Sequence, residues 1–299
     1  MSAGTAPIAH PHPGGAPDRP ELPEGAPDDA GAGAWPPWTA PVALIASFTV
    51  ALFASIVIGL VAAVFGASFT HPPASVEIVG TVAQDGALVA CAVLLARVGG
   101  LRPGPRRFGL RATPVLRGVG WAALTLVGAL AFTAVWSAVL AAHQREHLLH
   151  DLGADRGTVS MLAVAALVCV VAPIAEELFF RGFFFEALRP WRGTLVAALL
   201  TGLTFGAVHV VGTPVVYLAP LAFLGFVLCL LYRRTGSLYP GIGVHVTNNA
   251  LAFGVAQSWG WQIPVLLVAS LAAVAVVLGA VARAQRSATG VTAPVGLGG

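Results

Sequence analysis

Residues 172–185 read APIAEELFFRGFFF, a run that places two adjacent carboxylates and an arginine among alanine, isoleucine and phenylalanine. The whole chain has only 13 acidic residues in 299, so the position of Glu176 and Glu177 is informative. Ionisable groups in an apolar span are costly unless they are paired, and they usually mark a functional site. The surroundings of this run therefore decide both the fold and the candidate site.

The composition around this run is that of a membrane protein. Residues are 57% hydrophobic and 10% charged, whereas soluble domains carry about 25% charge. No Asp, Glu, Lys or Arg occurs at 30–76, 118–144, 193–232 or 235–282, and a spanning helix needs roughly 20 apolar residues. The sequence predicts an all-α polytopic membrane protein of about eight spans, at 42–66, 78–97, 116–141, 158–182, 194–211, 215–232, 238–257 and 262–282.

The arginines predict the orientation of these spans. Residues 97–117 hold six arginines and no acid, and further arginines follow the fourth, sixth and eighth predicted spans. Positive residues gather on the cytoplasmic side, so we expect a multi-pass cell-membrane protein with both termini in the cytoplasm. Because the arginines form no dense patch, we expect the lipid bilayer, and no nucleic acid, as a partner. The sequence leaves the oligomeric state unknown.

The two ends differ from the apolar middle. Residues 1–40 are rich in Pro, Gly and Ala, which predicts a disordered cytoplasmic tail. Trp35 and Trp38 precede the first span and are expected to anchor it at the membrane interface. Residues 41–286 are predicted to form the helical membrane domain, and 287–299 a flexible tail.

Few polar groups remain at membrane depth once loops and tails are set aside. Glu176, His209 and His245 come from the fourth, fifth and seventh spans. At about 1.5 Å per residue they lie roughly 20, 22 and 16 Å from the cytoplasmic ends of their helices. These spans are thus predicted to build one polar intramembrane chamber. Asp85, isolated in the second span, either bonds a neighbouring helix or lines that chamber.

Spacing within each helix adds detail to this chamber. Glu177 and Arg181 are an i,i+4 pair with the acid first, the favourable order, so we expect Arg181 to neutralise Glu177. Glu176 points about 100° away from Glu177 around the helix axis and stays available for chemistry. His245 and Asn249 share a helix face, from which Asn248 is turned aside.

Three motifs now stand in order on separate apolar segments: EELFFR at 176–181, FGAVH at 205–209 and HVTNN at 245–249. They resemble the EExxxR, FxxxH and HxxxN motifs of the CPBP family of intramembrane proteases. That family includes CAAX prenyl endopeptidases, bacteriocin-processing and immunity proteins, and the bacterial Abi proteins. The resemblance covers a core of about 165–255 and leaves the first three spans unexplained.

The resemblance implies a hydrolase that cuts a membrane-associated peptide or protein. Glu176 would activate water with help from His245, while His209 and Asn249 would polarise the scissile carbonyl or hold the oxyanion. Glu177 and Arg181 of the first motif and Phe205 of the second would have supporting roles.

The catalytic type stays open at this point. A metalloprotease would bind Zn²⁺ through Glu176, His209 and His245 with a water in the fourth position. A glutamate protease would need no cofactor, and the absence of an HExxH spacing favours it slightly.

Two other classes of function remain. A non-catalytic membrane scaffold or immunity-type protein of the same family would keep the motifs as a folding core. An ion-coupled transporter would also bury Glu, Arg and His side chains, but the polar groups cluster in one half of the chain and no internal repeat is visible.

Overall fold

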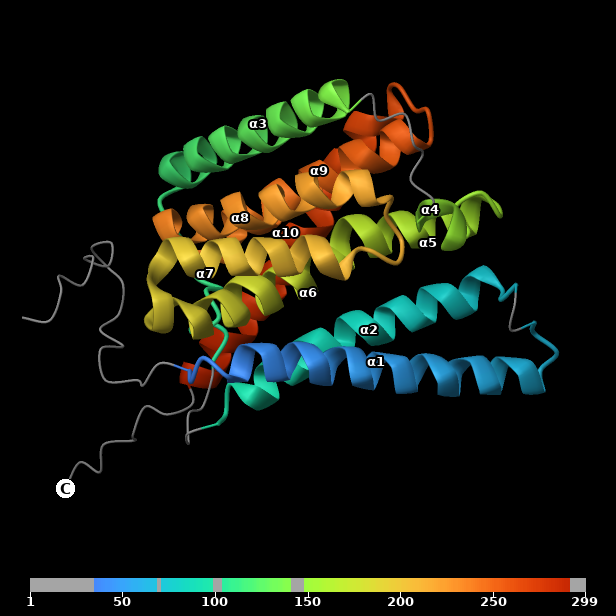
Figure 1. Cartoon of the computed structure of the whole chain (residues 1–299), viewed down its shortest axis with the longest axis horizontal. Coiled ribbons are helices and arrows are strands. Elements are labelled where there is room, and N and C mark those ends of the chain that lie inside the picture. The colour runs from blue at the N-terminus through green and yellow to red at the C-terminus, as the bar shows by residue number, and fades with distance from the viewer. Residues whose placement is uncertain (1–34, 69–70, 99–103, 141–147, 291–299) are drawn as a thin grey trace, which may run out of the picture.

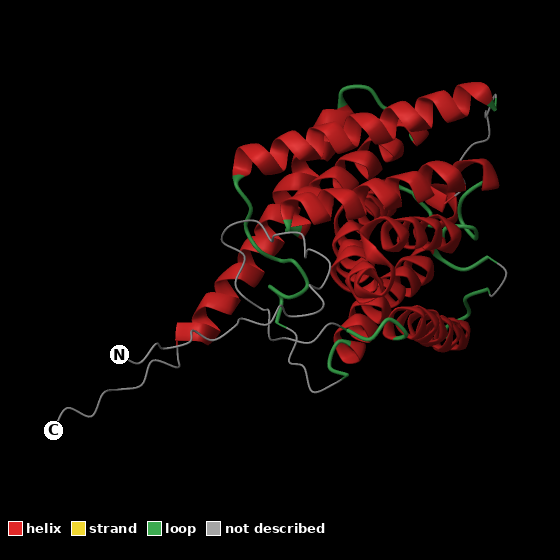
Figure 2. Cartoon of the chain, turned by 60° about the vertical axis from the view of Figure 1, so that its left-hand side comes forward, coloured by secondary structure: helices red, strands yellow, loops and turns green. Residues whose placement is uncertain are grey.

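The computed structural model describes residues 35–68, 71–98, 104–140 and 148–290, and all regular structure in this part is helical. Figure 1 shows helices lying side by side in a bundle, and Figure 2 shows the same chain coloured by secondary structure. The predicted all-α polytopic class is confirmed. Of the predicted tails, 1–40 and 287–299, residues 1–34 and 291–299 fall outside the described residues, whereas α1 already begins at Thr39 and α10 extends to Gly290.

Four long helices present much of their apolar surface outward. These are α1 (Thr39–Val64), α2 (Ala74–Leu95), α3 (Val115–Val139) and α10 (Gln262–Gly290). Large apolar side chains stay exposed along them, as on α1 at Ile45 and Phe53. Exposed apolar surface of this extent is unfavourable in water and suits lipid. In Figure 1, α1 and α2 form a hairpin at the lower side of the bundle.

A second group of elements carries the predicted motifs. After the short α4 (Leu148–Asp151), the chain runs through α5 (Thr158–Ala166), η1 (Leu167–Val171), α6 (Ala172–Phe179), η2 (Phe180–Phe185) and α7 (Glu186–Val208). Both η elements are π-helical segments, which frequently occur at functional sites. Gly193 has φ 76° and ψ 176°, which are not helical values. The helix α7 is therefore kinked at this residue.

The bundle is completed by α8 (Val215–Thr235) and α9 (Leu238–Ala256). Helices α7 and α8 approach each other at backbone distance, because a Cβ on Gly206 would lie 2.6 Å from the carbonyl oxygen of Leu218. At Gly202 a Cβ would lie 2.6 Å from the carbonyl oxygen of Ala222. These small residues let membrane helices pack closely, and they fix α7 beside the site described below.

The number of spans stays a prediction. Each of the eight predicted ranges contains a helix, and six helices of the described part are long and apolar enough to cross a membrane. One of these six is the continuous stretch Thr158–Val208, which contains the predicted fourth and most of the predicted fifth span, and α9 is not among the six. The orientation of the termini likewise stays a prediction.

The expected anchoring role of Trp35 is wrong. Its side chain is only 4% exposed and packs inside the protein, whereas Trp38 is 53% exposed. The Trp35 ring lies against Phe108 and Phe183, with ring centroids 5.4 and 5.1 Å away, and its indole N–H donates to the Ala96 carbonyl. Phe108, which precedes α3, and Phe183 of η2 form this slot, which nothing in the local sequence around Trp35 indicates.

Candidate active site

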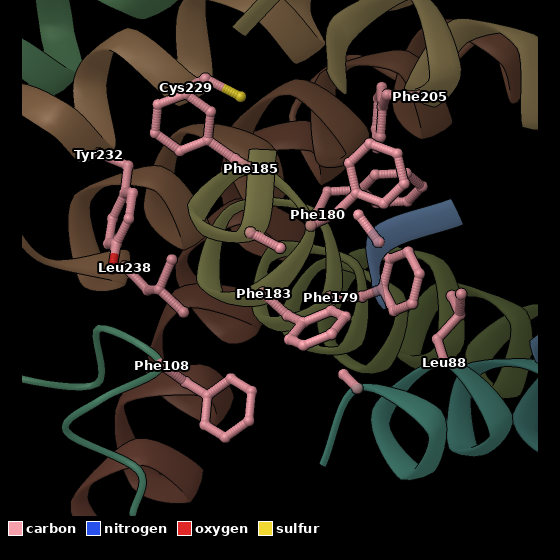
Figure 3. Packing of buried hydrophobic residues seen from close by; sticks show 14 of the residues in the cluster. Leu88, Phe108, Phe179, Phe180, Phe183, Phe185, Phe205, Cys229, Tyr232 and Leu238 are labelled. Carbon is pink, nitrogen blue, oxygen red and sulfur yellow. The ribbon is translucent and has the colours of Figure 1, made fainter. Parts of the chain in front are cut away.

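A cluster of aromatic side chains surrounds the charged motif. Figure 3 shows Phe179 and Phe180 on the side of Phe205, with Phe183 next to them and Phe185 beside Tyr232 and Cys229, and all five phenylalanines are buried. The phenylalanines of 179–185 thus pack in the core of the protein and do not face lipid. They exclude water from the polar groups between them, which strengthens every electrostatic interaction there.

Glu177 and Arg181 form the predicted ion pair inside this cluster. Arg181 Nη1 donates to Glu177 Oε1 at 2.6 Å, and both side chains are completely buried. Arg181 Nη2 also donates to the Gly225 carbonyl of α8, and its guanidinium lies 4.6 Å from the Phe205 ring centroid. A charge at such depth is tolerated only when it is paired and hydrogen-bonded, so this network locks α6 to α8.

His245 of α9 lies between the two motif carboxylates. Its Nδ1 is 2.9 Å from Glu177 Oε1, and its Nε2 is 3.7 Å from Glu176 Oε2. Because a carboxylate only accepts, Nδ1 carries the proton and donates it to Glu177. Glu177 therefore sets the orientation and tautomer of His245, in the way that a carboxylate orients a catalytic histidine elsewhere. The sequence did not reveal this contact, which joins residues 68 positions apart.

A glycine makes room for this arrangement. Glu177 Oε2 faces Gly241 of α9, where a Cβ would lie 3.1 Å from that oxygen. Gly241 precedes His245 by four residues, so both lie on the same face of α9. That spacing is the one signal from which Gly241 could have been found in the sequence.

Glu176 is the less enclosed carboxylate. Its side chain is 16% exposed, and its Oε2 is buried without a hydrogen-bond partner in the described part of the chain. The atom faces His245 Nε2 across a gap too long for a direct hydrogen bond. Glu177 Oε2 also lacks a hydrogen-bond partner among the described residues, but it faces the Gly241 backbone, so Glu176 is the motif carboxylate whose unbound oxygen faces His245 Nε2.

His209 stands at the end of α7 beside Phe205. Its Nδ1 is 2.7 Å from the Phe205 carbonyl oxygen, which only accepts, so Nδ1 carries a proton. The Phe205 ring contacts both imidazoles, with centroids 4.8 Å from His209 and 5.7 Å from His245. Phe205 thereby spaces the two histidines, and no hydrogen bond between described residues links His209 to Glu176 or His245.

Asn249 binds the π-helical segment η1. Its Nδ2 donates to the Val168 carbonyl at 2.9 Å. In a π-helix a carbonyl accepts from the N–H five residues later, which for Val168 is Pro173, a residue without an N–H. Asn249 supplies the missing donor. Asn248, which we expected to be turned aside, donates to Asn249 Oδ1 at 3.3 Å.

The three predicted metal ligands do not assemble here. Within the described residues, no group of three or more His, Cys, Asp or Glu side chains could hold a metal ion. Glu176 and His245 lie near each other, whereas His209 makes no hydrogen bond to either of them in the described residues. The described residues therefore do not form a three-ligand Zn²⁺ site. Whether the protein depends on a metal stays a prediction.

Comparison with known proteins agrees with the motifs. Residues 158–251 match the family model described as type II CAAX prenyl endopeptidase Rce1-like. The uncharacterized protein YyaK of Bacillus subtilis (strain 168) is 31% identical over 113 residues, which cover 36% of this chain and 38% of that protein. No solved structure matches.

The family match spans every motif residue that carried the resemblance, from Glu176 to Asn249. It supports a CAAX-type intramembrane protease, a hydrolase, in a chain with several apolar helices. Residues 158–251 are therefore similar to an Rce1-like type II CAAX prenyl endopeptidase domain, and this match supports the resemblance to the CPBP family of intramembrane proteases.

Proposed function

We propose that the protein is an intramembrane endopeptidase that hydrolyses a peptide bond of a membrane-associated protein or peptide. One observation carries this proposal: His245 is held by Glu177 through Nδ1 and turns Nε2 toward the unbound oxygen of Glu176. A general base and an oriented imidazole thus face each other in a site lined by phenylalanine. This pairing suits the activation of water for attack on a carbonyl.

The gap between the two groups fits the first step. At 3.7 Å, His245 Nε2 and Glu176 Oε2 are too far apart for a direct bond, and a water lying beside both atoms can bridge them. Glu176 takes a proton from the bridging water, whose oxygen attacks the carbonyl carbon of the substrate. Glu176 then returns that proton to the leaving amine, as a general base does in the reverse direction.

Stabilisation of the oxyanion falls to His209 and Asn249, but each has a constraint. With Nδ1 donating to the Phe205 carbonyl, His209 can donate to an oxyanion only through a protonated Nε2. Asn249 donates one side-chain N–H to the Val168 carbonyl, and its second N–H remains available to donate to the oxyanion. Donors fixed before the reaction stabilise the developing charge most effectively.

Glu177 and Arg181 act as support in this scheme. Their buried ion pair holds Glu177 in place as the acceptor of His245, and the Arg181 contact with Gly225 anchors the pair to α8. The bilayer is the proposed environment, and the substrate is a peptide or protein with a segment at the membrane. Cleavage of a prenylated protein, a bacteriocin precursor or another peptide is left for the assay to distinguish.

The test uses purified protein in liposomes with a panel of membrane-peptide substrates. Wild type should cleave at least one of them, and Glu176→Ala should lower the rate by about 10²-fold or more. Glu186→Gln is the matched control, because Glu186 lies near the same helix and pairs with Arg189 away from the site. Equal rates for wild type and Glu176→Ala would contradict the assignment, as would full rates in both His209→Ala and His245→Ala.

A cellular test addresses the scaffold alternative. Deleting the protein should produce the same phenotype as Glu176→Gln, since both remove the proposed catalytic base. A phenotype that is lost on deletion but unaffected by Glu176→Gln would show that binding, and not proteolysis, is the activity.

A further inference from the structure

Helices α3 and α8 pack against each other and run in opposite directions, so the start of α3 meets the end of α8 (Figure 1). At one end of this pair, the Trp136 indole N–H donates to the Val216 carbonyl. At the other end, the Arg234 guanidinium lies 5.3 Å from the centroid of the Trp121 ring. The fold thus brings together two helix ends that carry arginine and lie far apart in the sequence.

Trp121 is the fixed part of this corner. It is half-buried and packs against the apolar cluster that contains Leu224 and Leu228 of α8. Arg117 precedes Trp121 by four residues and therefore lies on the same face of α3. Both Arg117 and Arg234 are exposed. The indole thus has one exposed arginine of its own helix and one of α8 beside it.

The positive charge of this corner has no acidic partner in the described part of the chain. None of the ion pairs there includes Arg117, Arg233 or Arg234, and Glu186 is bound through both oxygens by Arg189. The negative end of the α8 dipole favours Arg233 and Arg234, but Arg117 stands in the first turn of α3, at the positive end of that dipole. Helix electrostatics therefore do not account for Arg117, whereas an anion bound beside Arg234 does.

The adjoining surface of α3 is apolar, since Leu116 and Val119 are 90% and 62% exposed. A ligand that covers both surfaces is anionic at one end and apolar at the other. Arginine binds phosphate oxygens in pairs, tryptophan is favoured at the level of lipid headgroups, and basic pockets between membrane helices bind anionic headgroups. We propose that Arg117, Trp121 and Arg234 bind the headgroup of one anionic phospholipid, whose acyl chains lie along Leu116 and Val119. This inference is independent of the proposed function.

Native mass spectrometry of the full-length protein in detergent micelles tests this site with phosphatidylglycerol and phosphatidylcholine of identical acyl chains. Wild type should bind phosphatidylglycerol about tenfold more tightly or better, because both arginines favour the net negative headgroup. Arg117→Gln and Arg234→Gln should each weaken phosphatidylglycerol binding about fivefold. Arg97→Gln is the matched control: it removes the same charge from an exposed position just after α2, which ends on the other side of the bundle from the start of α3 in Figure 1. It should change the binding by less than about twofold.

Three results would overturn the inference. The first is a wild-type protein that binds the two lipids equally, and the second is an Arg97→Gln variant that weakens binding as much as Arg117→Gln, which would mean general attraction to a charged surface. The third comes from inorganic phosphate: if it protects wild type from thermal unfolding as well as phosphatidylglycerol does, and Arg117→Gln removes that protection, the site binds a free anion and not a lipid. Should Arg234→Gln unfold more easily without lipid because Trp121 loses its cation, Arg117→Gln decides alone, since Arg117 is exposed.

Discussion

The contact between Gly241 and Glu177 makes the arrangement of the site testable by adding one methyl group. Glu177 is confined on both sides: Oε1 accepts from Arg181 and His245, and Oε2, which has no hydrogen-bond partner in the described residues, faces the Gly241 backbone. In Gly241→Ala the new Cβ lies 3.1 Å from Oε2, so the carboxylate must shift by a few tenths of an ångström. Gly243 on the same helix has nothing within 4 Å of such a Cβ and is the matched control.

The expected difference follows from two opposing terms. Replacing a helical glycine by alanine stabilises a helix by about 0.5–1 kcal/mol, and this gain is common to both variants. Forcing a methyl group into a packed site costs about 1–3 kcal/mol, and only Gly241→Ala incurs this cost. Gly241→Ala should therefore unfold about 1–3 kcal/mol more easily than Gly243→Ala. Because Glu177 positions His245, kcat of Gly241→Ala should also fall about tenfold.

Equilibrium unfolding in mixed detergent micelles gives the free energies, and peptide cleavage in liposomes gives kcat for the same preparations. The decisive quantity is the difference between the two alanine variants, since it cancels the shared helix propensity. Equal stability and equal kcat in Gly241→Ala and Gly243→Ala would show that Glu177 is not confined by α9, and the proposed positioning of His245 would fail.

Three further outcomes are expected. Asn249→Ala should cost about 1–3 kcal/mol of stability by leaving the Val168 carbonyl unsatisfied, whereas Asn248→Ala should cost less; equal losses in detergent unfolding would refute the capping role. Gly206→Ala should destabilise the protein by forcing α7 away from α8, while Gly128→Ala, with nothing within 4 Å of its Cβ, should not; similar melting temperatures would argue against backbone contact. Treating active protein with a chelator should leave the cleavage rate unchanged, and a loss that Zn²⁺ restores would establish metal dependence.

Sequence reasoning was most successful within single helices. The uncharged runs predicted the helical class, and the i,i+4 spacing of Glu177 and Arg181 predicted their ion pair, because helical geometry fixes which side chains of one helix are neighbours. In each case one element holds the information needed.

Contacts between helices were the part that the sequence could not supply. Periodicity gives the angle of Glu177 about its own helix, but not that α9 brings His245 to the same oxygen. The π-helical segments were also missed, although Pro173 explains in retrospect why Val168 needs a donor from Asn249. The burial of Trp35 could not be predicted, because the rings that pack against it belong to residues far along the chain.

The relative cleavage rates of Glu176→Gln and Glu186→Gln in liposomes examine the role of Glu176 in a single comparison. Both changes remove one carboxylate near the same helix, but only Glu176 faces His245. We expect Glu176→Gln to be at least about 10²-fold slower than wild type and Glu186→Gln to be within about twofold. Wild-type cleavage by a correctly folded Glu176→Gln variant would contradict the activation of water by this residue.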